Sequence, residues 1–80
     1  WRSFVEIRDG FIYVVTVENG KYYLGRYDGA LERTARSTEA VSENTFISFY
    51  GEYVYINRHG KKILVLKKND LSLVEVIEPK

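Results

Sequence analysis

Four short apolar segments separated by turn residues fill the stretch FISFYGEYVYINRHGKKILVLKKNDLSLVEVI, residues 46–77. Short runs of β-branched and aromatic residues, broken by Gly, Asn and Asp, are typical of antiparallel strands joined by tight turns. We therefore expect strands at residues 45–50, 53–57, 61–67 and 71–77. Pro79 cannot donate to a strand ladder and should end the pairing. This pattern predicts an all-β fold.

The earlier half of the chain has the same character. Strands are expected at residues 3–8, 11–17, 21–27 and, as a weaker outer strand, 30–36. Asp9-Gly10 and Asn19-Gly20 separate the first three of these strands. Asp-Gly and Asn-Gly pairs favour two-residue hairpin turns because Gly accepts a positive φ. The 11–17 run is apolar without a break, which predicts a strand buried on both faces.

The two halves align with each other. Phe4 and Phe46, Tyr13 and Tyr55, Asp28 and Asp70, and Leu31 and Leu73 each lie 42 positions apart. Four strands repeated at a period of about 40 to 50 residues are typical of propeller blades. We expect one all-β unit over residues 1–80, with a repeat at about 3–36, a polar connector at 37–44 and a second repeat at about 45–77.

The order of strand types in residues 46–77 resembles one blade of the WD40-like and peptidase-type β-propellers. The stretch lacks the Trp-Asp dipeptide of WD40 repeats and the double glycine of kelch repeats. The resemblance implies two four-stranded antiparallel meanders stacked face to face. Blades bury both faces against neighbours, so two blades leave two faces uncovered. We therefore expect self-association or membership of a larger propeller; an eight-stranded sandwich or barrel with one continuous core is the alternative.

The composition limits the kinds of catalytic and metal-binding site that the chain can form. The chain has no Cys, so it has no disulfide, thiolate metal site or cysteine nucleophile, and no redox compartment is favoured. The carboxylates lack the spacing of a calcium loop or zinc site, and the single histidine, His59, falls in a predicted turn. We expect no metal, no cofactor and no catalytic residue. No apolar run approaches the roughly 18 residues of a membrane span.

Other features bear on origin. The chain begins at Trp1 and contains no Met, from which we expect a piece of a larger protein. Cys, Met and Gln are absent while Lys, Arg and Glu are frequent, a bias typical of thermophile proteins.

Candidate binding residues form two groups. Tyrosines near turns should be exposed and suit a contact surface: Tyr22, Tyr27 and Tyr50. The 58–68 window is basic, through Arg58, Lys61, Lys62, Lys67 and Lys68. These cations and nearby tyrosines suit single-stranded nucleic acid, but they form two clusters if the 58–62 hairpin and the 67–69 turn lie at opposite ends of a sheet. Lysines at strand ends also block edge-to-edge aggregation.

The net charge of only +1 argues against a nucleic-acid partner. We expect a non-enzymatic interaction or scaffold module whose partner is protein, either itself or the remaining blades of a larger chain. One alternative is the substrate-gating propeller of a peptidase or hydrolase, which the family resemblance implies. The other is nucleic-acid binding through residues 58–68.

Overall fold

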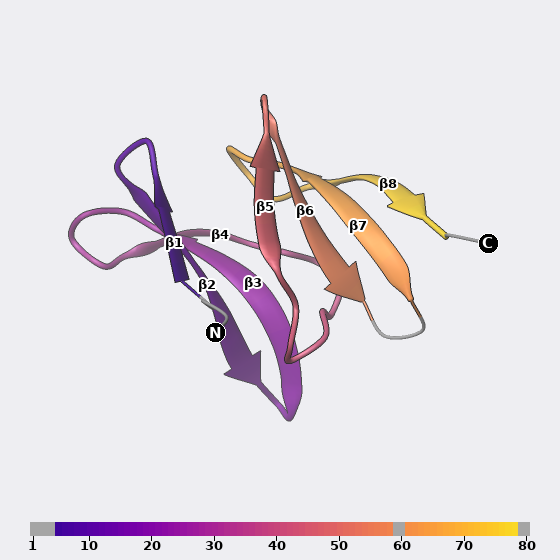
Figure 1. Ribbon diagram of the computed structural model, residues 1–80. Coiled ribbons are helices and arrows are strands. Elements are labelled where there is room, and N and C mark those ends of the chain that lie inside the picture. Colours follow the sequence, from indigo (N-terminus) through magenta and orange to yellow (C-terminus); the bar gives the residue numbers. More distant parts are fainter. Residues whose placement is uncertain (1–4, 59–60, 79–80) are drawn as a thin grey trace.

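The chain forms two four-stranded antiparallel sheets, each with its strands in sequence order (Figure 1). The computed structural model describes residues 5–58 and 61–78. The first sheet contains β1 (Val5–Arg8), β2 (Phe11–Glu18), β3 (Lys21–Tyr27) and β4 (Arg33–Arg36). The second sheet contains β5 (Ile47–Tyr50), β6 (Tyr53–Arg58), β7 (Lys62–Lys67) and β8 (Leu73–Ile77). The prediction of two meanders is confirmed; predictions for Trp1, Ser3, Phe4, His59, Gly60 and Pro79 fall outside the described residues.

The hairpin turns follow from the residues that occupy them. Asp9 and Gly10 have φ of 54° and 81°, and Asn19 and Gly20 have φ of 53° and 77°. Two consecutive left-handed residues make a type I′ turn, whose twist matches that of the flanking strands. The Asp-Gly and Asn-Gly turns therefore form where the sequence predicts them, and β2 runs one residue beyond the predicted end, to Glu18.

The fourth strand of the first sheet begins at Arg33, three residues later than predicted. The Asp28 carboxylate accepts hydrogen bonds from the backbone amides of Ala30 at 2.9 Å and Glu32 at 3.0 Å. Leu31 between them has a φ of 63°. A side chain that bonds its own backbone offers an alternative to the strand ladder, so residues 28–32 form a loop.

The second sheet repeats this deviation. Asp70 accepts a hydrogen bond from the Ser72 amide at 3.0 Å, Leu71 has a φ of 59°, and β8 begins at Leu73 instead of residue 71. The Ser72 bonds hold the pKa of the Asp70 carboxyl below its usual value of 3.8. These hydrogen bonds therefore favour the ionised form of the carboxyl.

The sheets pack face to face around one core (Figure 1). Apolar and aromatic side chains with at most 1% of their surface exposed come from both sheets, from the connector and from the turn before β8: Tyr13, Leu24, Val41, Val54, Ile56, Leu64, Leu66 and Leu71. Successive residues of a strand point to opposite faces, so each sheet gives one face to this core. Within one chain, the predicted burial of residues 11–17 on both faces is partial: Tyr13 is buried, Ile12 and Val14 on the opposite face are half-buried, and Val17 is exposed.

Polar contacts join the two sheets at one end. The Tyr13 hydroxyl donates to the Lys68 carbonyl at 3.0 Å and accepts from Arg26 Nε at 3.1 Å. The Tyr13 ring meets the Phe49 ring edge to face, with centroids 4.9 Å apart. Lys68 Nζ also lies 2.7 Å from Asp9 Oδ2. These contacts fix how the sheets lie on one another.

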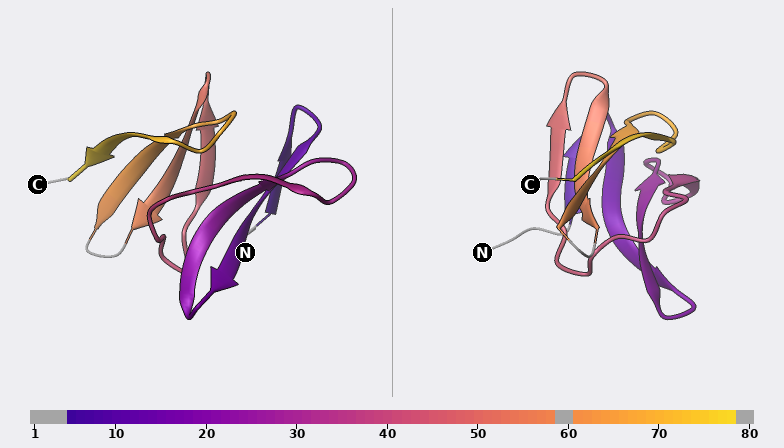
Figure 2. Two further views of the ribbon diagram at one scale, coloured as in Figure 1. Left: turned by 180° about the vertical axis from the view of Figure 1, so that it is seen from behind. Right: turned by 90° about the vertical axis from the view of Figure 1, so that its right-hand side faces the viewer.

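The connector ties the sheets together at the other end. It follows the edge of β3, where Ser37 and Val41 amides donate to the Leu24 and Tyr22 carbonyls, each at 2.8 Å. It then crosses to β6, where the Ser42 amide donates to the Asn57 carbonyl at 3.0 Å. Figure 2 shows this crossing from behind and from the side. The polar connector predicted at residues 37–44 therefore also covers an edge of the first sheet.

The first strand of the second sheet begins later than predicted, and Thr45, which follows the connector, explains why. Thr45 is buried, and its hydroxyl accepts a hydrogen bond from the Asn57 amide. Because this side-chain bond replaces a ladder bond, β5 begins at Ile47 rather than at Thr45 as predicted.

The strand registers of the two sheets correspond. Val5 pairs with Val14 and Ile47 pairs with Ile56, so this hairpin recurs 42 positions later. Ile12 pairs with Tyr27 and Val54 with Leu66, so the third strands recur 39 positions later. Both sheets shift register at the corresponding step, Arg26/Tyr27 and Val65/Leu66.

The two loops before the fourth strands also correspond. The Leu31 amide donates to the Asp28 carbonyl at 3.0 Å, and the Leu71 amide donates to the Lys67 carbonyl at 2.8 Å. Leu31 therefore corresponds to Leu71, and the predicted alignment of Leu31 with Leu73 and Asp28 with Asp70 is wrong. The constant spacing of 42 fails there because β6 and β7 have six residues each, whereas β2 has eight and β3 has seven.

Candidate functional site

The predicted basic window divides into two groups. Arg58, Lys61 and Lys62 lie at the β6–β7 hairpin, while Lys67 and Lys68 lie at the far end of β7. A strand of six residues separates its ends by roughly 17 Å. The five cations therefore form two clusters, as expected if the 58–62 hairpin and the 67–69 turn lie at opposite ends of a sheet.

Three of these five cations face a carboxylate. Arg58 lies 3.2 Å from Glu39, Lys62 lies 3.9 Å from Glu78, and Lys68 lies 2.7 Å from Asp9. The hydrogen bond from Lys68, together with its charge, holds the pKa of Asp9 below its usual value of 3.8. These pairings leave less free positive charge for a phosphate backbone.

The three candidate tyrosines differ in exposure. Tyr50 is 75% exposed, as predicted. Tyr22 and Tyr27 are half-buried and therefore less exposed than Tyr50. A hydrogen bond to Glu43 raises the pKa of the Tyr22 hydroxyl above 10.0. Tyr27 covers Gly25, where an added Cβ would lie 3.0 Å from the Tyr27 ring.

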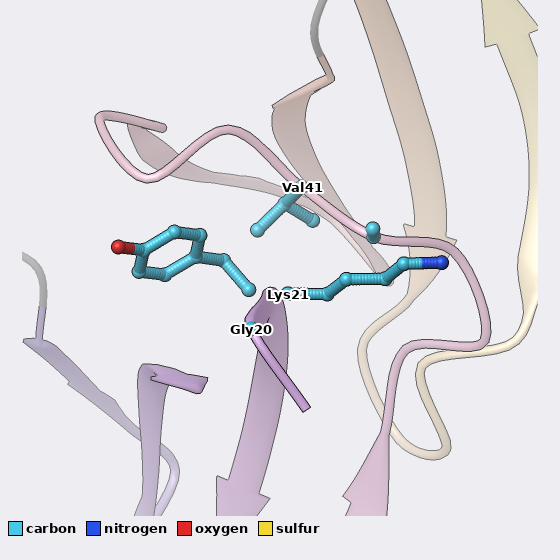
Figure 3. Close-up of a pocket in the computed structure, with 5 residues that line it drawn as sticks. Gly20, Lys21 and Val41 are labelled. Atoms are coloured by element: carbon cyan, nitrogen blue, oxygen red, sulfur yellow. The ribbon is translucent and has the colours of Figure 1, made fainter. Parts of the chain in front are cut away.

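Two open hollows of about 280 Å³ lie on the surface of the described residues. One lies between the start of β3 and the connector, lined by Gly20, Lys21, Tyr22, Ala40 and Val41 (Figure 3). The other lies beside the β5–β6 turn, lined by Glu52, Tyr53, Lys67 and Asn69. No Ser, Thr or His among the described residues lines either hollow.

Within residues 5–58 and 61–78, no group of three His, Asp or Glu side chains comes close enough together to hold a metal ion. No helix there has the length and apolar character to cross a membrane.

The face of the first sheet that is turned away from the second sheet, its outer face, is apolar. By strand alternation it carries Ile12 and Val14 of β2 and Tyr23 and Tyr27 of β3, all half-buried. On the edge strand β1, Ile7 is 71% exposed.

Charged groups border that face. The Arg36 guanidinium lies 4.0 Å from the centre of the Tyr23 ring. Glu18 pairs with Arg36 at 3.3 Å and with Arg33 at 2.7 Å. The centre of the face is therefore apolar and aromatic, and its rim is charged, which is the general composition of protein interfaces.

The outer face of the second sheet is similar. By alternation from the buried Val54 and Ile56, it carries Tyr53 and Tyr55 of β6 and Ile63 of β7, together with Val65, which is only 4% exposed. The side chain of Tyr50 lies on the same face at the edge strand β5, opposite Tyr53. The most exposed large apolar groups of the two outer faces are thus Ile7 and Tyr50. Sequence reasoning found Tyr50 and missed Ile7, although the Val-Glu-Ile-Arg alternation of β1 already separates Ile7 from Glu6.

No family model, curated protein or solved structure matches the chain.

Proposed function

We propose that this protein is a non-enzymatic scaffold module of the β-propeller type, whose two outer sheet faces bind further sheets. The observation that carries the proposal is the apolar, aromatic surface on both outer faces. Each face belongs to the same sheet that forms the core on its other side, so a second sheet can cover it in the same way.

The correspondence between the sheets supports a repeat. The first hairpins share their register, the third strands share a register shift, and Leu31 and Leu71 share a positive φ. Stacked repeat units contact only their neighbours, and about three or more are needed to bury a continuous core. Two units leave the outer faces for copies of the chain or for further blades.

Light scattering over a concentration series tests this function. We expect the apparent mass to rise above the 9.4 kDa of one chain as concentration increases. The apolar burial that drives association should also make it persist at high salt. A mass that stays at 9.4 kDa up to millimolar concentration contradicts the proposal.

A further inference from the structure

We infer that the outer face of the first sheet in one copy binds the outer face of the second sheet in another copy, head to tail. The contact would repeat the geometry that already joins the two sheets within one chain. This inference rests on the proposed function and names its partner as a second copy.

Corresponding strands turn opposite faces to the shared core. Tyr13 of β2 is buried in the core, while Tyr55, 42 positions later, lies on the outer face of the second sheet. Conversely Ile56 is buried, while Val14 lies on the outer face of the first sheet. The internal contact therefore joins two different faces, which makes it a heterologous contact that can be repeated.

The two outer faces correspond, in the repeat, to the two faces that pack against each other in the core. The face of the second sheet that packs inward corresponds to the outer face of the first sheet. The face of the first sheet that packs inward corresponds to the outer face of the second. Each copy therefore presents both halves of a contact that it has already made once internally.

Side chains that touch inside the chain identify the expected contact between copies. The Arg8 guanidinium lies 4.6 Å from the centre of the Phe49 ring. By the spacing of 42, Arg8 corresponds to Tyr50 and Phe49 corresponds to Ile7. We thus expect Ile7 of one copy to lie against Tyr50 of the next, and these two side chains are 71% and 75% exposed in one copy.

Leu31 supports the same pairing. Leu31 and Leu71 share a positive φ and a backbone hydrogen bond, but Leu71 is fully buried between the sheets and Leu31 is 71% exposed. A left-handed leucine is unfavourable. In the second sheet, burial of the Leu71 side chain offsets this conformational cost. In the first sheet, a copy placed head to tail would bury Leu31 in the same way.

Two lysine variants of the full chain test the inference. Ile7→Lys places a charge on the first outer face, and Tyr50→Lys places one on the second. Both side chains are exposed in a single copy, so folding should be unaffected. Val17→Lys is the matched control, because Val17 is 61% exposed and lies on neither outer face. Circular dichroism confirms that each variant is folded, and light scattering measures mass.

We expect each variant alone to associate at least tenfold more weakly than wild type and Val17→Lys. An equimolar mixture should form a dimer of about twice 9.4 kDa, because one intact first face meets one intact second face. If only one variant is weakened, like faces pair; this overturns the inference and leaves the proposed function standing. A mixture that stays monomeric, or variants that associate like wild type, also overturns it. A monomeric wild type overturns the proposed function as well.

Discussion

At the scale of residues, Tyr13 links the layers. Its ring is fully buried against Phe49, and its hydroxyl connects Arg26 of the first sheet with the Lys68 carbonyl after β7. A buried hydroxyl that makes two hydrogen bonds leaves two unsatisfied groups when it is removed. Tyr13 therefore sets the relative position of the sheets as well as filling the core.

Replacing Tyr13 by Phe should lower the free energy of unfolding by about 1–2 kcal/mol, since the ring is kept and the hydrogen bonds are lost. Urea denaturation measures the change. Tyr50→Phe is the control, because Tyr50 is 75% exposed and should lose little. Equal effects of the two variants would mean that the Tyr13 hydroxyl does not stabilise the fold.

The Asp9–Lys68 pair predicts a dependence on pH. The pKa of Asp9 is lowered in the folded chain, so its stabilising effect is full above 3.8 and is lost as pH falls through the folded pKa. Asp9→Asn keeps a residue that tolerates the left-handed turn. The Tm of wild type minus that of Asp9→Asn should decrease below pH 3.8, and 1 M salt should reduce the difference. A difference that is constant from pH 6 to pH 2 would exclude this linkage.

At the scale of elements, the hairpins follow directly from local sequence. Asp9-Gly10 and Asn19-Gly20 specify their turns because few other residue pairs adopt two consecutive left-handed conformations. The starts of β4 and β8 were predicted three and two residues too early, because they depend on Asp carboxylates bonding the loop backbone. A leucine gives no sequence signal for a positive φ, so the correct alignment of Leu31 with Leu71 was also missed.

Two glycines in turns provide a matched test. Gly20 has a φ of 77°, and an added Cβ would meet no atom within 4 Å. Gly20→Ala should therefore lower stability by about 1–2 kcal/mol through backbone strain alone. A Cβ added at Gly29 would also meet no atom within 4 Å, but Gly29 has no left-handed φ. Gly29→Ala should therefore be nearly neutral or slightly stabilising. Thermal unfolding compares them, and equal losses would contradict the turn assignment.

At the scale of the whole molecule, the succession of apolar runs and turn residues was enough to predict two stacked meanders with apolar surface left on their outer faces. The exposure of the candidate binding residues was harder to predict, because it depends on which face of each sheet meets the core. Tyr22 and Tyr27 are half-buried for this reason, and Lys68 is engaged by Asp9 of the other sheet. Such contacts between layers are invisible in a linear pattern.

Cysteine cross-linking detects the proposed head-to-tail contact between two copies. The chain has no native Cys. Ile7→Cys and Tyr50→Cys would be mixed and treated with a bis-maleimide spanning about 10 Å, the spacing of packed sheets. Val17→Cys mixed with either variant gives the background. Mass spectrometry of the digest should find the 7–50 link well above that background and above the 7–7 and 50–50 links. Predominant 7–7 or 50–50 links, or no link above background, would contradict the account.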